Sequence, residues 1–246
     1  MTSWEFPVNE PVDLQVRVPA GDVIVRAAAT QTATVTLAGS ERSLDATRVE
    51  FDEGTLSVIT PDRLRLGRRG DLDVTVEVPE GSTCLVHTAS ADVSCTGELS
   101  ALDVQTASGD VNAERVTGLA RADTASGDVY LGEAAEADLK SASGDVSVGR
   151  VTGPVTVNTA SGDVRIAAAS GGRTEARSAS GDIVVAVAPG IGVYLDLSTV
   201  SGTVRSELEP TGESGDADMT LSCRTLSGDV EVLRAARPAT PNTAHR

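Results

Sequence analysis

One six-residue motif recurs along most of this chain and constrains its fold more than any other feature. It reads Thr-Ala-Ser-Gly-Asp-Val at residues 106–111, and eight close or looser copies occur between Thr88 and Val230. Measured from serine to serine, the copies are 18, 18, 17, 18, 19, 21 and 26 residues apart. A short, nearly fixed period is typical of a solenoid, in which each repeat is one turn that buries its apolar face only against its neighbours.

The apolar residues around each motif change phase at the Gly-Asp pair. Before the motif serine, apolar and hydroxyl side chains alternate with period two, as in Val104, Thr106 and Ser108. After the pair, the apolar residues lie an odd number of positions beyond that serine, as Val111 does. A period-two pattern indicates a strand with one buried face, so the change of phase indicates a bend that keeps the same face inward. We therefore expect each turn to contain two strands joined by a Gly-Asp corner, with a second corner near a glycine and the motif serine facing inward.

Stacking these turns in register would place columns of like residues in the interior. A column of buried Thr and Ser hydroxyls is tolerable when each hydroxyl donates to one neighbour and accepts from the other. An antiparallel meander is the alternative, because Gly-Asp is also a good two-residue hairpin turn. The near identity of successive copies favours a parallel β-solenoid, since parallel turns place like residues directly on one another.

The composition predicts a thin core and three segments. Hydrophobic residues make up 40% of the 246 residues and aromatic residues only 2%, so the core must consist mainly of small aliphatic side chains. Residues 1–81 lack the repeat but contain period-two runs, which predict an N-terminal β-strand cap over the open end of the stack. Residues 82–233 are predicted as a β-solenoid of about eight turns of ~18 residues. Residues 234–246 are predicted as a disordered tail.

Charge and cysteine usage exclude several classes of partner. The formal net charge of −16 argues against nucleic acid, because phosphate binding needs a concentrated basic face. No run approaches the ~18 apolar residues of a membrane span, and the N-terminus has no export-signal pattern. Cys84, Cys95 and Cys223 form neither an even set nor a metal-ligand spacing, which indicates reduced buried thiols. We therefore expect an acidic, cytoplasmic protein without a membrane span, as a monomer or small oligomer.

The tandem Thr-Ala-Ser-Gly-Asp-Val units behind a strand-rich N-terminal segment resemble a known bacterial family. Its members are β-strand-repeat proteins classed as a domain of unknown function and often labelled "putative adhesin". The resemblance covers about residues 10–233 and implies a parallel β-solenoid fold without established enzymatic activity. It also implies a link of some members to cell-envelope stress responses, and it offers no catalytic residues to carry over.

The aspartates of the motif form the first candidate site. Seven copies carry one: Asp92, Asp110, Asp128, Asp145, Asp163, Asp182 and Asp229. Stacked carboxylates on a β-roll suggest calcium, which would relieve their mutual repulsion; the candidate ligands are Asp110, Asp128, Asp145, Asp163 and Asp182. However, only one aspartate occurs in each ~18-residue turn, far fewer oxygen ligands than calcium takes, and Thr203 replaces it in one copy. We interpret the aspartates as acceptors that cap the corner, and we expect neither a metal nor another cofactor.

A second candidate is a cluster of arginines, and a third is the histidines. Arg63, Arg65, Arg68 and Arg69 crowd one segment of an acidic chain, as a docking patch for an acidic partner or as a solvated hairpin tip. The only histidines are His87 and His245, and the position of His87 is taken in other copies by Gln, Asp, Lys, Asn and Arg. Such variety indicates a solvated face rather than a general base, so we predict that the protein is not an enzyme.

These observations predict a non-catalytic scaffold or interaction protein that docks a protein partner, linked to envelope-stress or regulatory signalling. One alternative is a self-assembling structural β-helix of the bactofilin type. The net charge of −16 and the irregular last copies argue against open-ended stacking. A calcium-dependent adhesin is the other alternative, and it requires export.

Overall fold

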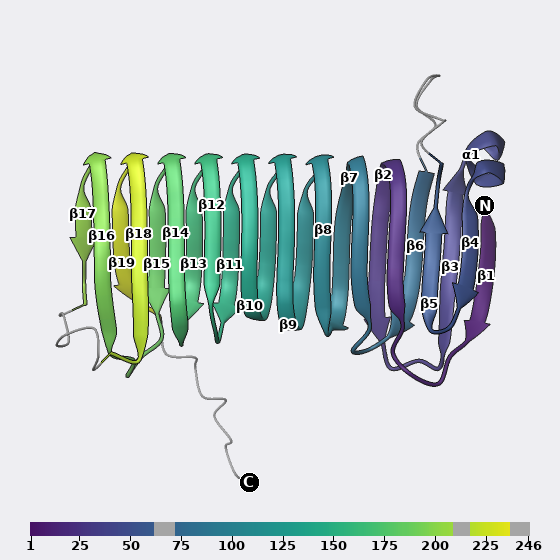
Figure 1. Ribbon diagram of the computed structural model, residues 1–246, viewed down its shortest axis with the longest axis horizontal. Coiled ribbons are helices and arrows are strands. Elements are labelled where there is room, and N and C mark those ends of the chain that lie inside the picture. The colour runs from purple at the N-terminus through teal and green to yellow at the C-terminus, as the bar shows by residue number, and fades with distance from the viewer. Residues whose placement is uncertain (62–71, 209–216, 237–246) are drawn as a thin grey trace, which may run out of the picture.

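The computed structural model describes residues 1–61, 72–208 and 217–236. These residues form one large sheet of 19 strands, most of them parallel, together with one short helix. Figure 1 shows the strands side by side along the long axis of the molecule, in a front and a back layer. The predicted all-β class is confirmed, and the sheet is solenoid-like without closing on itself.

Parallel pairing of equivalent residues builds the first turns. β2 (Asp13–Ala28) pairs with β7 (Thr83–Leu99), which in turn pairs with β8 (Ala101–Ser108) and with the first part of β9 (Val111–Ser126). β10 (Val129–Ser143) lies on β9, with Val129 opposite Val111. Because like residues face one another one repeat apart, the parallel arrangement is confirmed over the antiparallel meander.

The next turns each consist of two separate strands joined by the Gly-Asp corner. These strands are β11 (Val146–Val151), β12 (Val155–Ser161), β13 (Val164–Ala169), β14 (Gly172–Ser180) and β15 (Ile183–Val187). In one layer β12 lies on β10 and β14 lies on β12; in the other, β11, β13 and β15 follow β10 in that order.

The last two turns of the chain are stacked in exchanged order. β18 (Met219–Ser227) lies between β14 and β16 (Val193–Ser201), and β19 (Val230–Arg234) lies between β15 and β17 (Val204–Ser206). The turn that the chain makes first is therefore outermost, and the later turn fills the space beneath it (Figure 1). This differs from the sequential stacking that a steady repeat suggests.

At the other end of the stack, three antiparallel strands are added outside the parallel ones. β5 (Thr55–Ile59) and β6 (Leu72–Pro79) pair in parallel with β2. β4 (Arg48–Asp52) then adds antiparallel to β5, β3 (Thr32–Gly39) to β6, and β1 (Thr2–Pro7) to β3. The parallel turns begin at β2, ahead of the predicted boundary at residue 81, so the division into a cap and a solenoid stays a prediction.

Most of the aromatic side chains gather at this N-terminal end. The rings of Phe6 and Phe51 contact each other with centroids 5.6 Å apart, and Trp4 packs against the same core. These are three of the five aromatic residues of the chain. Helix α1 (Glu41–Ala46) contacts β3 and begins after Ser40, whose hydroxyl accepts a hydrogen bond from the Ser43 N–H. Large rings thus fill the end of a core that small aliphatic side chains fill elsewhere.

All three cysteines are buried as free thiols. Burial raises the pKa of the Cys223 thiol to about 12. The hydrogen bond between the Cys84 and Cys95 thiols, together with burial, raises the pKa of Cys84 well above its ordinary value. The thiols of Cys84 and Cys223 therefore stay protonated near neutral pH, which makes them core side chains rather than nucleophiles or metal ligands.

The hydroxyl column differs from the prediction. The hydroxyl oxygens of Thr106, Thr124, Ser141 and Thr159 are buried without a hydrogen-bond partner. Stacked side chains are separated by the strand spacing of about 4.8 Å, which is too long for one hydroxyl to reach the next. Three hydroxyls of the column donate instead to the carbonyl of a corner glycine in the adjacent turn, as Thr225 does to Gly181 at 3.1 Å.

The motif serine was also predicted to face inward, and this is wrong. Ser108, Ser126 and Ser143 are exposed, because the chain is already turning at this position. The backbone carbonyl of the serine has the structural role instead. The Ser126 carbonyl accepts the N–H of Gly109 from the adjacent turn at 3.1 Å.

Candidate functional site

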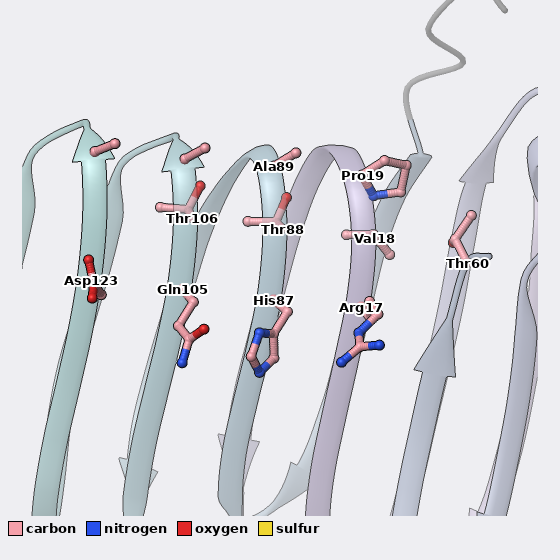
Figure 2. A pocket seen from close by; sticks show the side chains of 12 residues that line it. Arg17, Val18, Pro19, Thr60, His87, Thr88, Ala89, Gln105, Thr106 and Asp123 are labelled. Atoms are coloured by element: carbon pink, nitrogen blue, oxygen red, sulfur yellow. The ribbon is translucent and has the colours of Figure 1, made fainter. Parts of the chain in front are cut away.

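A shallow groove lies on the outer face of the sheet, near the corners of the first turns. It has a volume of about 520 Å³ and runs across β2, β7, β8 and β9, with Thr60 at one side. Four polar side chains line it in a row: Arg17, His87, Gln105 and Asp123. Figure 2 shows them at the same level of four neighbouring strands, with Thr60 on the next strand.

The parallel register explains this row. Arg17 pairs with His87, His87 with Gln105, and Gln105 with Asp123, so the four residues occupy one outward position of successive turns. At about 4.8 Å per strand the row is roughly 15 Å long. Small side chains follow it towards the corners, namely Pro19, Ala89, Ala107 and Ala125. Their small size makes the groove, and it lets a ligand approach the backbone closely.

The polar side chains of this row have no partners within the described part of the chain. In two other outward columns, one of them on the opposite layer, the charges are paired between turns. Arg115 contacts Glu98 at 3.7 Å and Glu133 at 2.9 Å, and Arg121 lies 3.5 Å from both Asp103 and Asp138. In contrast, neither a side-chain hydrogen bond nor an ion pair joins Arg17, His87, Gln105 or Asp123 to another described residue. Their donors and acceptors are therefore free to bind another molecule.

The corner aspartates form a ladder with the backbone. The Oδ1 atom of Asp110 accepts the N–H of Asp128 at 2.9 Å, and the same contact recurs at 2.7–2.9 Å in six other steps of the stack. The ladder passes from Asp182 to Asp229 and ends at Thr203, whose N–H donates to Asp229. The predicted acceptor role is confirmed. The exchanged order also explains Thr203, because no further turn of the described residues stacks on the outermost turn and would need its carboxylate.

Comparison with known proteins identifies the family of this chain. Residues 12–233 match the family described as Toastrack DUF4097. The chain belongs to this family. The similar solved structures include a putative adhesin from Bacteroides fragilis NCTC 9343, with a TM-score of 0.59 and 14% identity, covering 94% of this chain and 96% of that one. A putative lipid binding protein from Parabacteroides distasonis ATCC 8503 has a TM-score of 0.54 and 15% identity, covering 95% and 96%. At such identities the likeness concerns the fold alone.

Two further findings concern this Toastrack chain. Curated proteins provide no match to it. None of the helices in the described ranges is both long and apolar enough to cross a membrane.

The other predicted site residues of the Toastrack chain fall in different places. Arg63, Arg65, Arg68 and Arg69 lie outside the described residues, as does most of the predicted tail. The five candidate calcium ligands are exposed along the corners, each bound through Oδ1 to a backbone N–H. Across the described ranges, no cluster of three or more His, Cys, Asp or Glu side chains is arranged to hold a metal.

The sequence places three residues of the groove at one position of the repeat, but it does not predict that they line a groove. His87, Gln105 and Asp123 share one position of the repeat, and that variety indicated a solvated face. Arg17 was missed because it precedes the eight copies of the motif, and only the Gly21-Asp22 pair, which repeats the Gly-Asp of the motif, indicates that β2 is a turn of the stack. The register of Asp22 with Asp92 supplies that link.

The aspartate ladder of the Toastrack chain leads to a first prediction. Asp145→Ala should lower the free energy of unfolding by about 1–2 kcal/mol, because the Asp163 N–H loses the carboxylate that it contacts at 2.8 Å. Asp145→Asn keeps an acceptor oxygen and should lose less than half of that amount. Urea denaturation of both variants measures the difference, and equal losses would contradict an acceptor role for this side chain.

Proposed function

We propose that this Toastrack chain is a non-catalytic interaction protein that docks a protein partner in the outer groove. The row of Arg17, His87, Gln105 and Asp123 carries this proposal, because its polar groups are unpaired while the charges of the adjacent Arg121 column are paired. The parallel backbone fixes the spacing of the row, so binding requires little ordering of the protein itself.

The geometry of the groove favours binding over catalysis. A general base must lie within about 3 Å of the group it deprotonates. Asp123 is two turns away from His87, roughly 10 Å at the strand spacing, so it cannot orient the imidazole by a direct hydrogen bond. The neighbours of His87 in the row are Arg17 and Gln105, and neither is a nucleophile. The row offers hydrogen bonds and charge without a nucleophile–base pair.

The groove also favours one type of partner. Its charge runs from Arg17 at one end to Asp123 at the other, over roughly 15 Å of flat sheet. An extended protein segment with an acidic group and a basic group at that separation would complement it. Such a segment also supplies backbone groups for His87 and Gln105. We place this partner in envelope-stress or regulatory signalling, the setting that the family resemblance suggests.

The alternatives receive less support from these contacts. A lipid ligand, as in the name of the P. distasonis relative, would leave the polar row unpaired. A calcium-dependent adhesin would need the corner aspartates, and one oxygen of each is already bound to the backbone.

A photo-cross-linking amino acid at position 105 tests the proposal. In cells of the source organism, we expect a discrete protein adduct from Gln105 and none from the matched position Asn112, which is exposed on the opposite layer. Reversing the charges with Arg17→Glu and Asp123→Lys should abolish the adduct while leaving the melting temperature nearly unchanged, because both side chains are exposed. Equal adducts from both layers, or an adduct that survives the charge reversal, would refute docking in this groove.

A further inference from the structure

The four polar side chains of the groove carry opposite charges at the two ends of their row. Arg17 and Asp123 lie at the ends, and the polar His87 and Gln105 lie between them (Figure 2). The parallel register spaces all four evenly, one turn apart. A row of this kind is complementary to itself when it is reversed. The groove of a second copy of the chain therefore offers the groups with which this row can pair.

A two-fold axis between β7 and β8, parallel to the strands, brings two such rows together. The outer faces of the two copies then face each other, and the order of the strands in one copy runs against that in the other. Arg17 lies opposite Asp123 of the second copy and His87 lies opposite Gln105, and each contact occurs twice. All four side chains thus obtain a partner that none of them has within the described part of one chain. A contact with two-fold symmetry closes at the dimer.

Like charges are not directly opposite one another around the groove either. The same axis places three charged neighbours of the row opposite uncharged side chains of the second copy: Lys140 opposite Ile59, Arg121 opposite Gln15, and Asp103 opposite Leu85.

The face that this contact covers has no net charge, unlike the chain as a whole. It consists of eight neighbouring strands, in the spatial order β4, β5, β2, β7, β8, β9, β10 and β12. The groove row and the charged row beside it hold four basic and four acidic residues on these strands: Arg17, Arg48, Arg121, Lys140, Glu50, Asp103, Asp123 and Asp138. Because each chain carries a formal charge of −16, two copies approach with less repulsion through a neutral face than through an acidic one.

We propose that the groove of one chain docks on the groove of a second copy, and that this dimer masks the groove until the protein partner competes for it. The inference rests on the function proposed above, because it concerns the regulation of the same groove. The small side chains beside the row, such as Ala89 and Ala107, leave room for the polar side chains of the second copy.

The size and chemistry of the contact indicate a weak and reversible dimer. Eight strands are about 38 Å wide and three outward rows are about 20 Å deep, which gives about 1,500 Å² buried in total. Exposed ion pairs contribute little each, so we expect a dissociation constant on the order of tens of micromolar. A partner that matches the row can then displace the second copy.

Sedimentation equilibrium of the full chain over a concentration series tests this docking. We expect the 25.1 kDa monomer in equilibrium with a species of twice that mass. Arg17→Glu and Asp123→Lys should each raise the dissociation constant at least tenfold, because each change acts twice in a symmetric dimer. Mixing the two single variants should restore association, since opposite charges then face one another in both pairs. Arg165→Glu is the matched control, an exposed arginine on the opposite layer.

The variant that combines Arg17→Glu with Asp123→Lys gives a second readout. It should dimerise with itself, because both pairs are reversed together, and it should not associate with the parent chain. A chain that stays monomeric at every concentration would overturn the inference. So would an Arg17→Glu variant that dimerises like the parent chain, single variants that fail to associate when mixed, or species that grow beyond the dimer.

The combined variant also separates this inference from the proposed function. In cells it should lose the partner adduct from position 105, whereas the purified variant should keep the dimer. An adduct of two chains has twice the mass of one chain and is thereby distinguished from the partner adduct. A monomeric purified chain together with a partner adduct in cells would refute the masking alone. A dimer without any partner adduct would refute the proposed function alone.

Discussion

Replacing Gly162 with alanine is expected to lower the free energy of unfolding by about 3–5 kcal/mol. Gly162 has a φ of +147°, in a region that favours glycine. A Cβ atom at this position would also lie 2.1 Å from the carbonyl oxygen of Gly144 in the adjacent turn. Backbone strain and overpacking therefore act together, and neither turn can move without breaking the ladder above and below it. Urea denaturation measures the loss.

Gly54 provides the matched control for this prediction. It also has a positive φ, +82°, but a Cβ added there would meet no atom within 4 Å. Gly54→Ala should therefore cost only the backbone strain, about 1 kcal/mol. Similar losses for the two variants would show that the close approach of the turns at the corner contributes little.

Leu221→Ala is expected to lower the free energy of unfolding by about 3 kcal/mol, and Leu195→Ala by only about 1 kcal/mol. Leu221 is 0% exposed and lies between Thr174 and Leu195 in the stack. Leu195 belongs to the outermost turn and is only partly buried. The larger cavity and the larger loss of buried area thus arise at the residue that comes later in the chain.

This pair of variants also reports the order of the last two turns. If the turns were stacked in the order of the sequence, Leu195 would lie inside the stack and Leu221 at its end. The ranking of the two losses would then be reversed. Denaturation of both variants distinguishes the two orders.

The repeat predicted the arrangement of most of the chain because each bend and each pairing depends on residues within one repeat and its nearest copies. The phase change at Gly-Asp gave the corner, and near-identical copies gave parallel register. The predicted acceptor role of the aspartates followed from their place at the corner. The orientation of Ser108 did not follow, because counting alternate residues assumes a straight strand and the chain has already begun to turn there.

The exchanged order could not be predicted from the motif copies. Residues 193–206 and 219–234 carry the same pattern of apolar, hydroxyl and glycine residues. The residue types alone would therefore allow either turn to pair with β14 and β15. Thr203 is the one sign of the exchanged order in the sequence of these turns, since it lacks the carboxylate to which a turn stacked on it would donate an N–H. The groove was equally hidden, because its members become one row only when Arg17 is placed in register with His87.

The exchanged order has a consequence for synthesis of the chain. A regular repeat protein can add one turn at a time as it leaves the ribosome, since each new turn finds its neighbour already in place. Here residues 193–206 emerge before residues 219–234, the segment with which they pair in the finished protein. Until that segment arrives, they have either no neighbour or β14 and β15, which are the wrong ones. The last part of the chain to be made therefore completes two turns at once, and a product that stops short of it cannot stack residues 193–206 on their native neighbours.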